Sequence, residues 1–180
     1  MKNYFIIHGT FGNNRENWFG WLENELKAKG YDVYNFNYPT PEGHNFENWS
    51  KVLSRAKDKI NEESVFVCHS IAPIFLIKYC LKNNTKIGKL VSVSGANNFK
   101  VGVPDFDDIN KFMFVDDVSK FKDLCKERIC IYSKDDPYIS RDKLQEFAKS
   151  IDAKEIVYEN AGHFNTSSGY SEFKDIEKYL

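Results

Sequence analysis

The chain has 180 residues, a formal net charge of −1, 42% hydrophobic residues and 28% charged residues. This length fits a single domain, and the composition excludes an intrinsically disordered chain. The balanced charge offers no surface that would neutralise phosphates, so we expect no nucleic-acid binding.

Membrane insertion and disulfide formation are not expected either. No apolar run approaches the length that spans a bilayer, and the longest strongly apolar stretch is 71–76. The first residues do not have the pattern of a secretory signal. The four cysteines form no C-x-x-C pair. We therefore expect a cytoplasmic protein with reduced thiols and without a zinc site.

Apolar runs alternate with helical patterns in the first half of the chain. Three strands are predicted, at 3–8, 31–37 and 64–69. Helices are predicted where apolar residues recur every three or four positions, at 17–29, 46–61 and 71–82. The third helix is apolar on nearly all sides and should be covered by other elements. Its Pro73 falls in the first turn, where proline removes no hydrogen bond.

The same alternation continues in the second half. Strands are predicted at 89–95, 128–133 and 154–159, and helices at 118–127, 140–151 and 169–180. The segment 96–117 is less regular and rich in Phe, Asp and Gly, which makes it a candidate cap or lid. Six strands alternating with helices predict one α/β domain over 1–180, with a mostly parallel sheet covered by helices on both faces.

Candidate catalytic residues follow three of the predicted strands. Ser70 follows the third strand, Asp135 and Asp136 follow the fifth, and His163 follows the sixth. The carboxyl ends of parallel strands meet at one edge of a sheet, where active sites form. A serine, an acid and a histidine in this chain order are typical of an α/β-hydrolase triad.

Each residue type suits one role in such a triad. Ser70 would be the nucleophile, raised above the sheet by a sharp turn between strand and helix. His163 would take the serine proton and return it to the leaving group, while one of Asp135 and Asp136 holds the histidine tautomer. The turn normally needs small neighbours, and here they are Cys68 and Ala72 instead of glycines. We therefore expect a turn that is slightly wider or strained differently.

Backbone groups near Ser70 are candidates for an oxyanion hole. The N–H of Ile71 begins the helix and points its dipole toward developing negative charge. The N–H of Thr10 or Phe11, in the loop after the first strand, is the candidate second donor.

With these motifs, the chain resembles the small serine-hydrolase family of the YdeN and retinoblastoma-binding-protein-nine type, within the α/β-hydrolase superfamily. The matching segments are YFIIHGTFGN, NWFGWLENEL, FVCHSIAP, LVSVSG, YSKDDPYIS and NAGHFN. The resemblance implies a compact α/β-hydrolase fold with six strands in the order 2-1-3-4-5-6. It also implies Ser70 as nucleophile, His163 as base and Asp136 as acid, because D-P-Y-I-S aligns with the superfamily pattern D-P-x-V-P.

The other histidines are interpreted as structural. His8 is expected to orient the oxyanion loop, His69 to pack beneath the turn or to hydrogen-bond locally, and His44 to be solvated.

Aromatic side chains are the candidate apolar wall of the substrate pocket, although tryptophans at helical spacing are more often part of a core. The candidates are Trp18, Phe99, Phe112 and Phe114.

The sequence thus predicts a carboxylesterase-like serine hydrolase that cleaves a carboxylic ester or related activated acyl compound through an acyl-enzyme on Ser70. The implied partner is a small-molecule acyl substrate. No metal or organic cofactor is implied, and no sequence feature supports a protein partner.

Two alternatives stay open. One is an interaction module that kept the fold and lost activity, which the altered turn at Cys68 and Ala72 would support. The other is an acyltransferase with the same triad. A receiver module is disfavoured, because its paired acids follow the first strand, which here ends in His8 and Gly9.

Overall fold

A single six-stranded parallel sheet forms the centre of the protein in the computed structural model, which describes residues 2–180. The strands are β1 (Asn3–Ile7), β2 (Asp32–Asn35), β3 (Val65–His69), β4 (Ile87–Val93), β5 (Cys125–Ser133) and β6 (Lys154–Tyr158). They lie in the order β2-β1-β3-β4-β5-β6, and every neighbouring pair is parallel. The predicted α/β fold and its strand order are confirmed.

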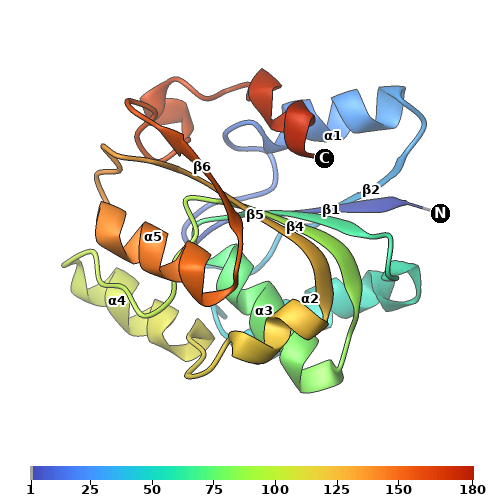
Figure 1. Cartoon of the computed structure of the whole chain (residues 1–180), viewed down its shortest axis with the longest axis horizontal. Helices are drawn as coiled ribbons and strands as arrows, with labels where there is room; N and C mark the ends of the chain where they lie inside the picture. The colour runs from blue at the N-terminus through green and yellow to red at the C-terminus, as the bar shows by residue number, and fades with distance from the viewer. Residues whose placement is uncertain (1) are drawn as a thin grey trace.

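Helices cover both faces of the sheet. They are α1 (Phe19–Ala28), α2 (Phe46–Leu53), α3 (Ala72–Asn83), α4 (Pro104–Asn110) and α5 (Arg141–Ser150). Figure 1 shows α1 and the C-terminal segment on one face, and α2, α3 and α5 on the other. Each face has its own cluster of buried apolar side chains, so both faces of the sheet are closed to water. No helix within residues 2–180 has the length and apolar character needed to cross a bilayer.

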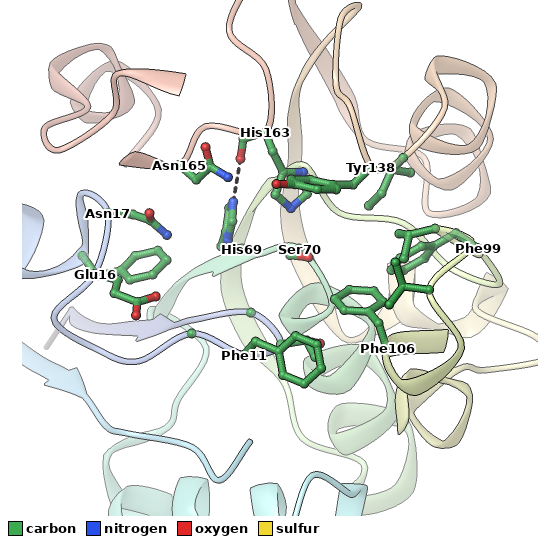
Figure 2. A pocket seen from close by; sticks show the side chains of 17 residues that line it. Phe11, Glu16, Asn17, His69, Ser70, Phe99, Phe106, Tyr138, His163 and Asn165 are labelled. Carbon is green, nitrogen blue, oxygen red and sulfur yellow. Dashed lines mark hydrogen bonds between the residues drawn. The ribbon is translucent and has the colours of Figure 1, made fainter. Parts of the chain in front are cut away.

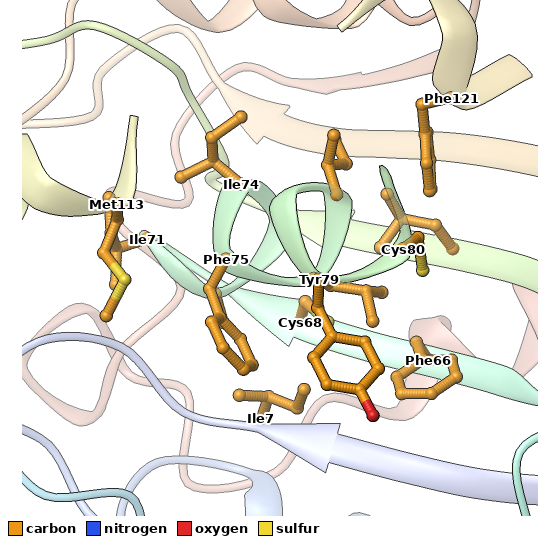
Figure 3. Close-up of a cluster of buried hydrophobic side chains, with 14 of the residues drawn as sticks. Ile7, Phe66, Cys68, Ile71, Ile74, Phe75, Tyr79, Cys80, Met113 and Phe121 are labelled. Atoms are coloured by element: carbon orange, nitrogen blue, oxygen red, sulfur yellow. The ribbon is translucent and has the colours of Figure 1, made fainter. Parts of the chain in front are cut away.

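Helix α3 is the central element of the larger cluster. Figure 3 shows Phe75 and Tyr79 of this helix directed toward Ile7 and Phe66 on the sheet. Eight of the twelve residues of the helix are buried, in line with its apolar sequence. Full burial of a large apolar side chain contributes roughly 1.5–3 kcal/mol to stability. This packing fixes the start of α3, which carries the site described below.

The four cysteines are buried in or beside this core as free thiols. Burial raises the pKa of each thiol above its ordinary value. The residues are Cys68, Cys80, Cys125 and Cys130. The thiols are therefore protonated and poorly nucleophilic at neutral pH.

Three predicted helices are wrong in type or length. The segment 169–180 holds only a 3₁₀ helix at Lys174–Tyr179. Its buried residues Phe173 and Ile176 lie three apart, a spacing that one 3₁₀ turn satisfies. The segment 118–127 is likewise a short 3₁₀ helix at Ser119–Asp123.

Tertiary pairing and a backbone kink explain the remaining differences. Cys125 pairs with Ile87, so β5 begins inside the segment for which we predicted a helix. The predicted helix 46–61 ends as an α-helix at Leu53. It continues as a 3₁₀ segment in which Ala56 has a non-helical backbone, with φ of −121°.

Candidate active site

The turn between β3 and α3 holds Ser70 in an unusual backbone conformation. Its φ is +60°, in the left-handed region that residues other than glycine rarely occupy. The Ser70 N–H donates to the carbonyl oxygen of Val93 at 2.9 Å, which ties the turn to the end of β4. Such strain persists only where the surrounding structure enforces it, and it clusters at functional sites.

The turn accommodates a Cβ on both sides of the serine. Cys68 and Ala72 are fully buried in the apolar cluster around α3. The close approaches occur instead at glycines that follow neighbouring strands. A Cβ on Gly9 would lie 2.8 Å from Ser70 Cβ, and one on Gly95 would lie 2.7 Å from Pro73 Cγ. Glycine is therefore required in the loops beside the turn and not in the turn itself.

His163 and Asp136 form a buried pair above the same turn. The Nδ1 atom of His163 lies 2.7 Å from Oδ2 of Asp136, whose side chain is 0% exposed. The other oxygen of Asp136 accepts hydrogen bonds from the N–H groups of Tyr138 and Ile139, at 2.9 and 3.1 Å. Because a carboxylate only accepts, Nδ1 is the donor, and Nε2 is left for the pocket. Figure 2 shows the His163 imidazole facing Ser70.

Asp135 has a different role from its neighbour. Its Oδ1 accepts from the Ser133 hydroxyl at 2.5 Å and from the N–H groups of Ala161 and Gly162, at 3.1 and 2.9 Å. The Ser133 and Gly162 hydrogen bonds lower the pKa of the Asp135 carboxyl. Asp135 therefore fixes the loop that carries His163, whereas Asp136 contacts the imidazole itself.

His69 supports His163 from below. Its Nε2 lies 2.8 Å from the carbonyl oxygen of His163, so Nε2 is the donor. The two rings pack edge to face, with centroids 4.8 Å apart. Burial lowers the pKa of His69 to about 3, so the ring stays neutral near pH 7. His69 is buried and lines the cavity beside His163, and its hydrogen bond is not local, because the partner lies 94 residues along the chain.

The loop after β1 is held by His8, as expected. His8 Nδ1 donates to the carbonyl oxygen of Gly9 at 2.8 Å, and Nε2 accepts from the N–H of Tyr38 at 2.8 Å. Burial lowers the pKa of His8, which favours this neutral form.

The candidate oxyanion donors are not equivalent. The N–H of Phe11 donates to the Thr40 hydroxyl at 2.9 Å, so it is already occupied. Within residues 2–180, the N–H groups of Thr10 and Ile71 have no hydrogen-bond partner. Of the two donors predicted in this loop, only Thr10 stays a candidate.

A cavity of about 410 Å³ opens directly above Ser70 and His163. Apolar side chains line most of it: Phe11, Phe19, Phe99, Val101, Val103, Phe106, Tyr138 and Ile139. Figure 2 shows Phe99 and Phe106 on one side of Ser70, and Tyr138 packed against the His163 ring, with centroids 5.0 Å apart. The segment 96–117 thus supplies much of the apolar wall.

Of the predicted wall residues, only Phe99 lines this cavity. Trp18 is fully buried in the other cluster, where its Nε1 donates to the carbonyl oxygen of Phe164 at 2.9 Å. Phe112 is 57% exposed, away from the pocket. Phe114 faces the neighbouring hollow and contacts Phe99 at 5.6 Å between ring centroids.

His44 is also misplaced by the sequence analysis. It is 5% exposed and packs against Trp49, with ring centroids 4.9 Å apart, instead of being solvated. Burial lowers its pKa to about 4. The turn-rich sequence around His44 gave no indication that this loop packs against Trp49 in the core.

Sequence reasoning missed Val101, Val103 and Phe106 as lining residues. They lie in the irregular segment 96–117, where the sequence showed no strand or helix periodicity. Residues at the opposite end of the cavity were missed as well, namely Glu16, Asn17 and Asn165.

Comparisons with known proteins bear on the family and on the fold of the chain. The family model described as serine hydrolase matches residues 4–180. YdeN of Bacillus subtilis (strain 168) is 28% identical over 172 residues, covering 94% of this chain and 90% of that protein. The crystal structure of the B. subtilis ydeN gene product superposes with a TM-score of 0.90 at 26% identity, covering 100% of this chain and 97% of that one.

A more distant structure shows the fold alone. The α/β-hydrolase domain-containing protein 10 from mouse has a TM-score of 0.72 at 12% identity, covering 92% of this chain and 84% of that one.

Proposed function

The chain belongs to the serine hydrolase family, within the α/β-hydrolase superfamily, and from this premise we propose that it hydrolyses a carboxylic ester or related activated acyl compound. The proposed catalytic residues are Ser70, His163 and Asp136. The observation that carries the proposal is the buried Asp136–His163 hydrogen bond of 2.7 Å, directed at a strained serine on the floor of one cavity.

The first half-reaction forms an acyl-enzyme. Ser70 Oγ attacks the carbonyl carbon of the substrate, and its proton passes to Nε2 of His163. The N–H groups of Ile71 and Thr10 stabilise the negative charge on the carbonyl oxygen. The Asp136 carboxylate stabilises the imidazolium. The tetrahedral intermediate collapses, the bond to the leaving alcohol breaks, and the alcohol takes the proton from His163.

The second half-reaction reverses these roles with water. His163 takes a proton from a water molecule, whose oxygen attacks the acyl carbon of the acyl-enzyme. The ester bond to Ser70 breaks, the acid is released, and the proton returns to Ser70 Oγ. No other reactant is needed.

The apolar wall supports an acyl substrate with one short or medium hydrocarbon arm. Phe99, Val101 and Phe106 would contact that arm beside Ser70. Burial of such an arm supplies roughly 25 cal/mol per Å² of apolar surface.

Covalent labelling tests the proposal directly. The intact protein is treated with a fluorophosphonate, and its mass is measured beside that of Ser70→Ala. We expect one adduct on the parent protein and none on the variant. Peptide mapping should place the adduct on Ser70. An unlabelled parent protein that remains folded would overturn the proposal and favour a binding module.

Hydrolysis itself is measured with p-nitrophenyl esters of increasing chain length. The His163→Gln variant should bind the same esters but lose turnover. Adding an alcohol to the reaction distinguishes hydrolysis from acyl transfer, because a transferase would form the new ester in preference to the acid.

A further inference from the structure

The end of the cavity opposite Phe99 and Phe106 carries three polar side chains. Figure 2 shows Glu16, Asn17 and Asn165 on one side of Ser70, with Phe99 and Phe106 on the other. A substrate with its acyl carbon at Ser70 would therefore place one arm among aromatic rings and the other among these three polar groups. The proposed reaction assigns no task to the three.

Hydrogen bonds fix the orientation of both asparagine side chains. The Oδ1 atom of Asn17 accepts from the N–H of Thr166 at 2.9 Å and from its hydroxyl at 3.2 Å. The Oδ1 atom of Asn165 accepts from the N–H of Ser168 at 3.0 Å, and from the hydroxyls of Ser167 and Ser168 at 2.7 and 2.9 Å. A backbone N–H can only donate, so the amide oxygens cannot exchange places with the nitrogens.

The amide nitrogens are consequently left for a ligand. Figure 2 shows the nitrogens of Asn17 and Asn165 directed toward the interior of the cavity. In the part of the chain that the structure describes, neither Nδ2 atom has a hydrogen-bond partner. Each NH₂ group is an obligatory donor that is already oriented, so binding an acceptor there costs little ordering of side chains.

The two donors come from loops that hold each other. Asn17 precedes α1 and has φ of +51°. Asn165 lies two residues after His163 and caps the short 3₁₀ helix at Thr166–Ser168. The hydrogen bond from Thr166 to Asn17 joins the loops, so both donors keep a fixed position relative to the imidazole.

Glu16 adds a negative charge at the same end. Its Oε1 accepts from Asn13 Nδ2 at 2.7 Å, and no lysine, arginine or histidine pairs with it among residues 2–180. An uncompensated carboxylate repels an anionic group and can accept a hydrogen bond from an N–H. The subsite thus offers two donors and one acceptor to an uncharged group.

We propose that Asn17 and Asn165 determine specificity by binding the carbonyl oxygen of a carboxamide on the substrate arm opposite the apolar arm. Glu16 accepts the carboxamide N–H and excludes the corresponding carboxylate. This inference rests on the proposed hydrolase function, which supplies the reacting centre at Ser70. The substrate class is an ester with one hydrocarbon arm and one arm that ends in an uncharged amide.

Matched esters test the preference. Three terminal groups of similar shape are compared: a carboxamide, an isopropyl group and a carboxylate. One set carries the group on the alcohol, as butyrate esters of 4-hydroxybutanamide, 4-methylpentanol and 4-hydroxybutanoate. The other set carries it on the acyl chain, as ethyl esters of adipamic acid, 6-methylheptanoic acid and monoanionic adipic acid. Acid release in a pH-stat gives kcat/KM for each ester.

The expected result is a preference for the carboxamide in one of the two sets, which also identifies the arm. A neutral hydrogen bond is worth a factor of roughly 2 to 12 in binding. We therefore expect the carboxamide ester to exceed its isopropyl analogue about 10-fold in kcat/KM, and the carboxylate ester to be the poorest of the three.

Asparagine-to-aspartate changes probe the donors with little change in shape. Asn17→Asp and Asn165→Asp keep the oxygen that the Thr166 and Ser168 N–H groups need, and they replace only the NH₂ group. Each change should lower the carboxamide-to-isopropyl ratio about 2- to 10-fold, whereas a loss of folding alone would lower both rates and leave the ratio unchanged.

Glu16→Gln should raise the relative rate on the carboxylate ester several-fold. The matched control is Glu172→Gln, which removes the charge of a carboxylate outside this cavity and should leave all ratios unchanged.

Failure of this inference is distinguishable from failure of the proposed function. If fluorophosphonate labels Ser70 but wild-type protein prefers the carboxamide less than twofold in both sets, or hydrolyses neither member of a pair, the carboxamide subsite is wrong. If Ser70 is not labelled and no ester is cleaved, the hydrolase proposal fails, and the subsite fails with it.

Discussion

The two sides of the cavity are built in different ways. On the catalytic side, Ser70, Asp136 and His163 lie in the turn and loops that follow strands of one sheet, and hydrogen bonds to backbone groups fix the turn and the acid. On the apolar side, the wall comes from the irregular segment 96–117. Its loop is held mainly by side-chain caps, such as Asp107 accepting from the N–H groups of Val101 and Gly102 at 2.8 and 3.0 Å.

This difference separates chemistry from selectivity. The reacting groups depend on strand ends that cannot move without breaking the sheet, whereas wall residues such as Val103, which is 52% exposed, depend on a peripheral segment. Changes on the catalytic side should therefore affect turnover of every substrate. Changes in the wall should alter only which substrates are accepted.

The largest expected effect contrasts the two adjacent aspartates. Asp136→Asn should lower kcat about 10⁴-fold, because the amide no longer holds the His163 tautomer or stabilises its cation. Asp135→Asn keeps an oxygen for the Ala161 and Gly162 N–H groups, so its effect on kcat should be far smaller. Both are measured with a p-nitrophenyl ester, with circular dichroism as a check of folding. Equal losses would contradict the assignment of Asp136 as the acid.

The second effect concerns the loop beside Ser70. Gly9→Ala would place a Cβ 2.8 Å from Ser70 Cβ and 3.4 Å from its Oγ, so the loop that carries the Thr10 N–H must shift. We expect kcat to fall about 10²- to 10³-fold, as when one oxyanion donor is lost. Gly20→Ala is the control, since no atom lies within 4 Å of its added Cβ. Normal turnover in Gly9→Ala would show that the loop does not supply the donor.

The third effect is on stability and concerns two buried histidines, His69 on the cavity and His44 beside Trp49. His69 and His44 have pKa values lowered to about 3 and about 4 by burial. The unfolded chain binds protons near pH 6.5, so stability is full above that pH and falls as the pH drops toward the folded-state values. Each histidine should cost about 2 kcal/mol at pH 5, or about 30-fold in the unfolding equilibrium.

Urea unfolding at pH 7.5 and pH 5 measures this loss. In each of the variants His44→Gln and His69→Gln, the difference in the free energy of unfolding between pH 7.5 and pH 5 should shrink by about 2 kcal/mol. An undiminished difference in either variant would mean that the histidine is not buried neutral in the folded protein.

The smallest effect should appear in the wall. Phe106 lines the cavity and contacts Phe11, with ring centroids 5.6 Å apart, whereas Phe112 lies outside it. Phe106→Ala should lower kcat/KM for a p-nitrophenyl hexanoate about 10-fold through lost apolar contact, and change the acetate little. Phe112→Ala should change either ester less than twofold. If the two variants behave alike, the wall does not select the acyl chain.

The sequence predicted best what strand periodicity controls. The alternation of strands and helices agrees with the structure, as does the strand order that the family resemblance implied. The structure brings Ser70 and His163 to one cavity, with Asp136 hydrogen-bonded to His163. Buried strands impose a strong pattern on the sequence, and the residues after them share one edge of the sheet.

The remaining features of the site depend on tertiary packing, which leaves no local pattern in the sequence. Trp18 has the helical spacing of a pocket aromatic or a core aromatic alike, and only its contact with Phe164 identifies it as core. Phe106 was missed because α4 is short and starts after an irregular stretch. The glycine requirement at Gly9 arises from a loop and a turn that are distant in sequence.

Because all four thiols are buried, the rate at which they react can measure how often the folded chain opens. None of them lines the cavity above Ser70, so a reagent that enters it meets a hydroxyl and an imidazole and no sulfur. Iodoacetamide should then alkylate the cysteines only when the core opens and exposes them. The alkylation rate would report the frequency of this opening, independently of turnover.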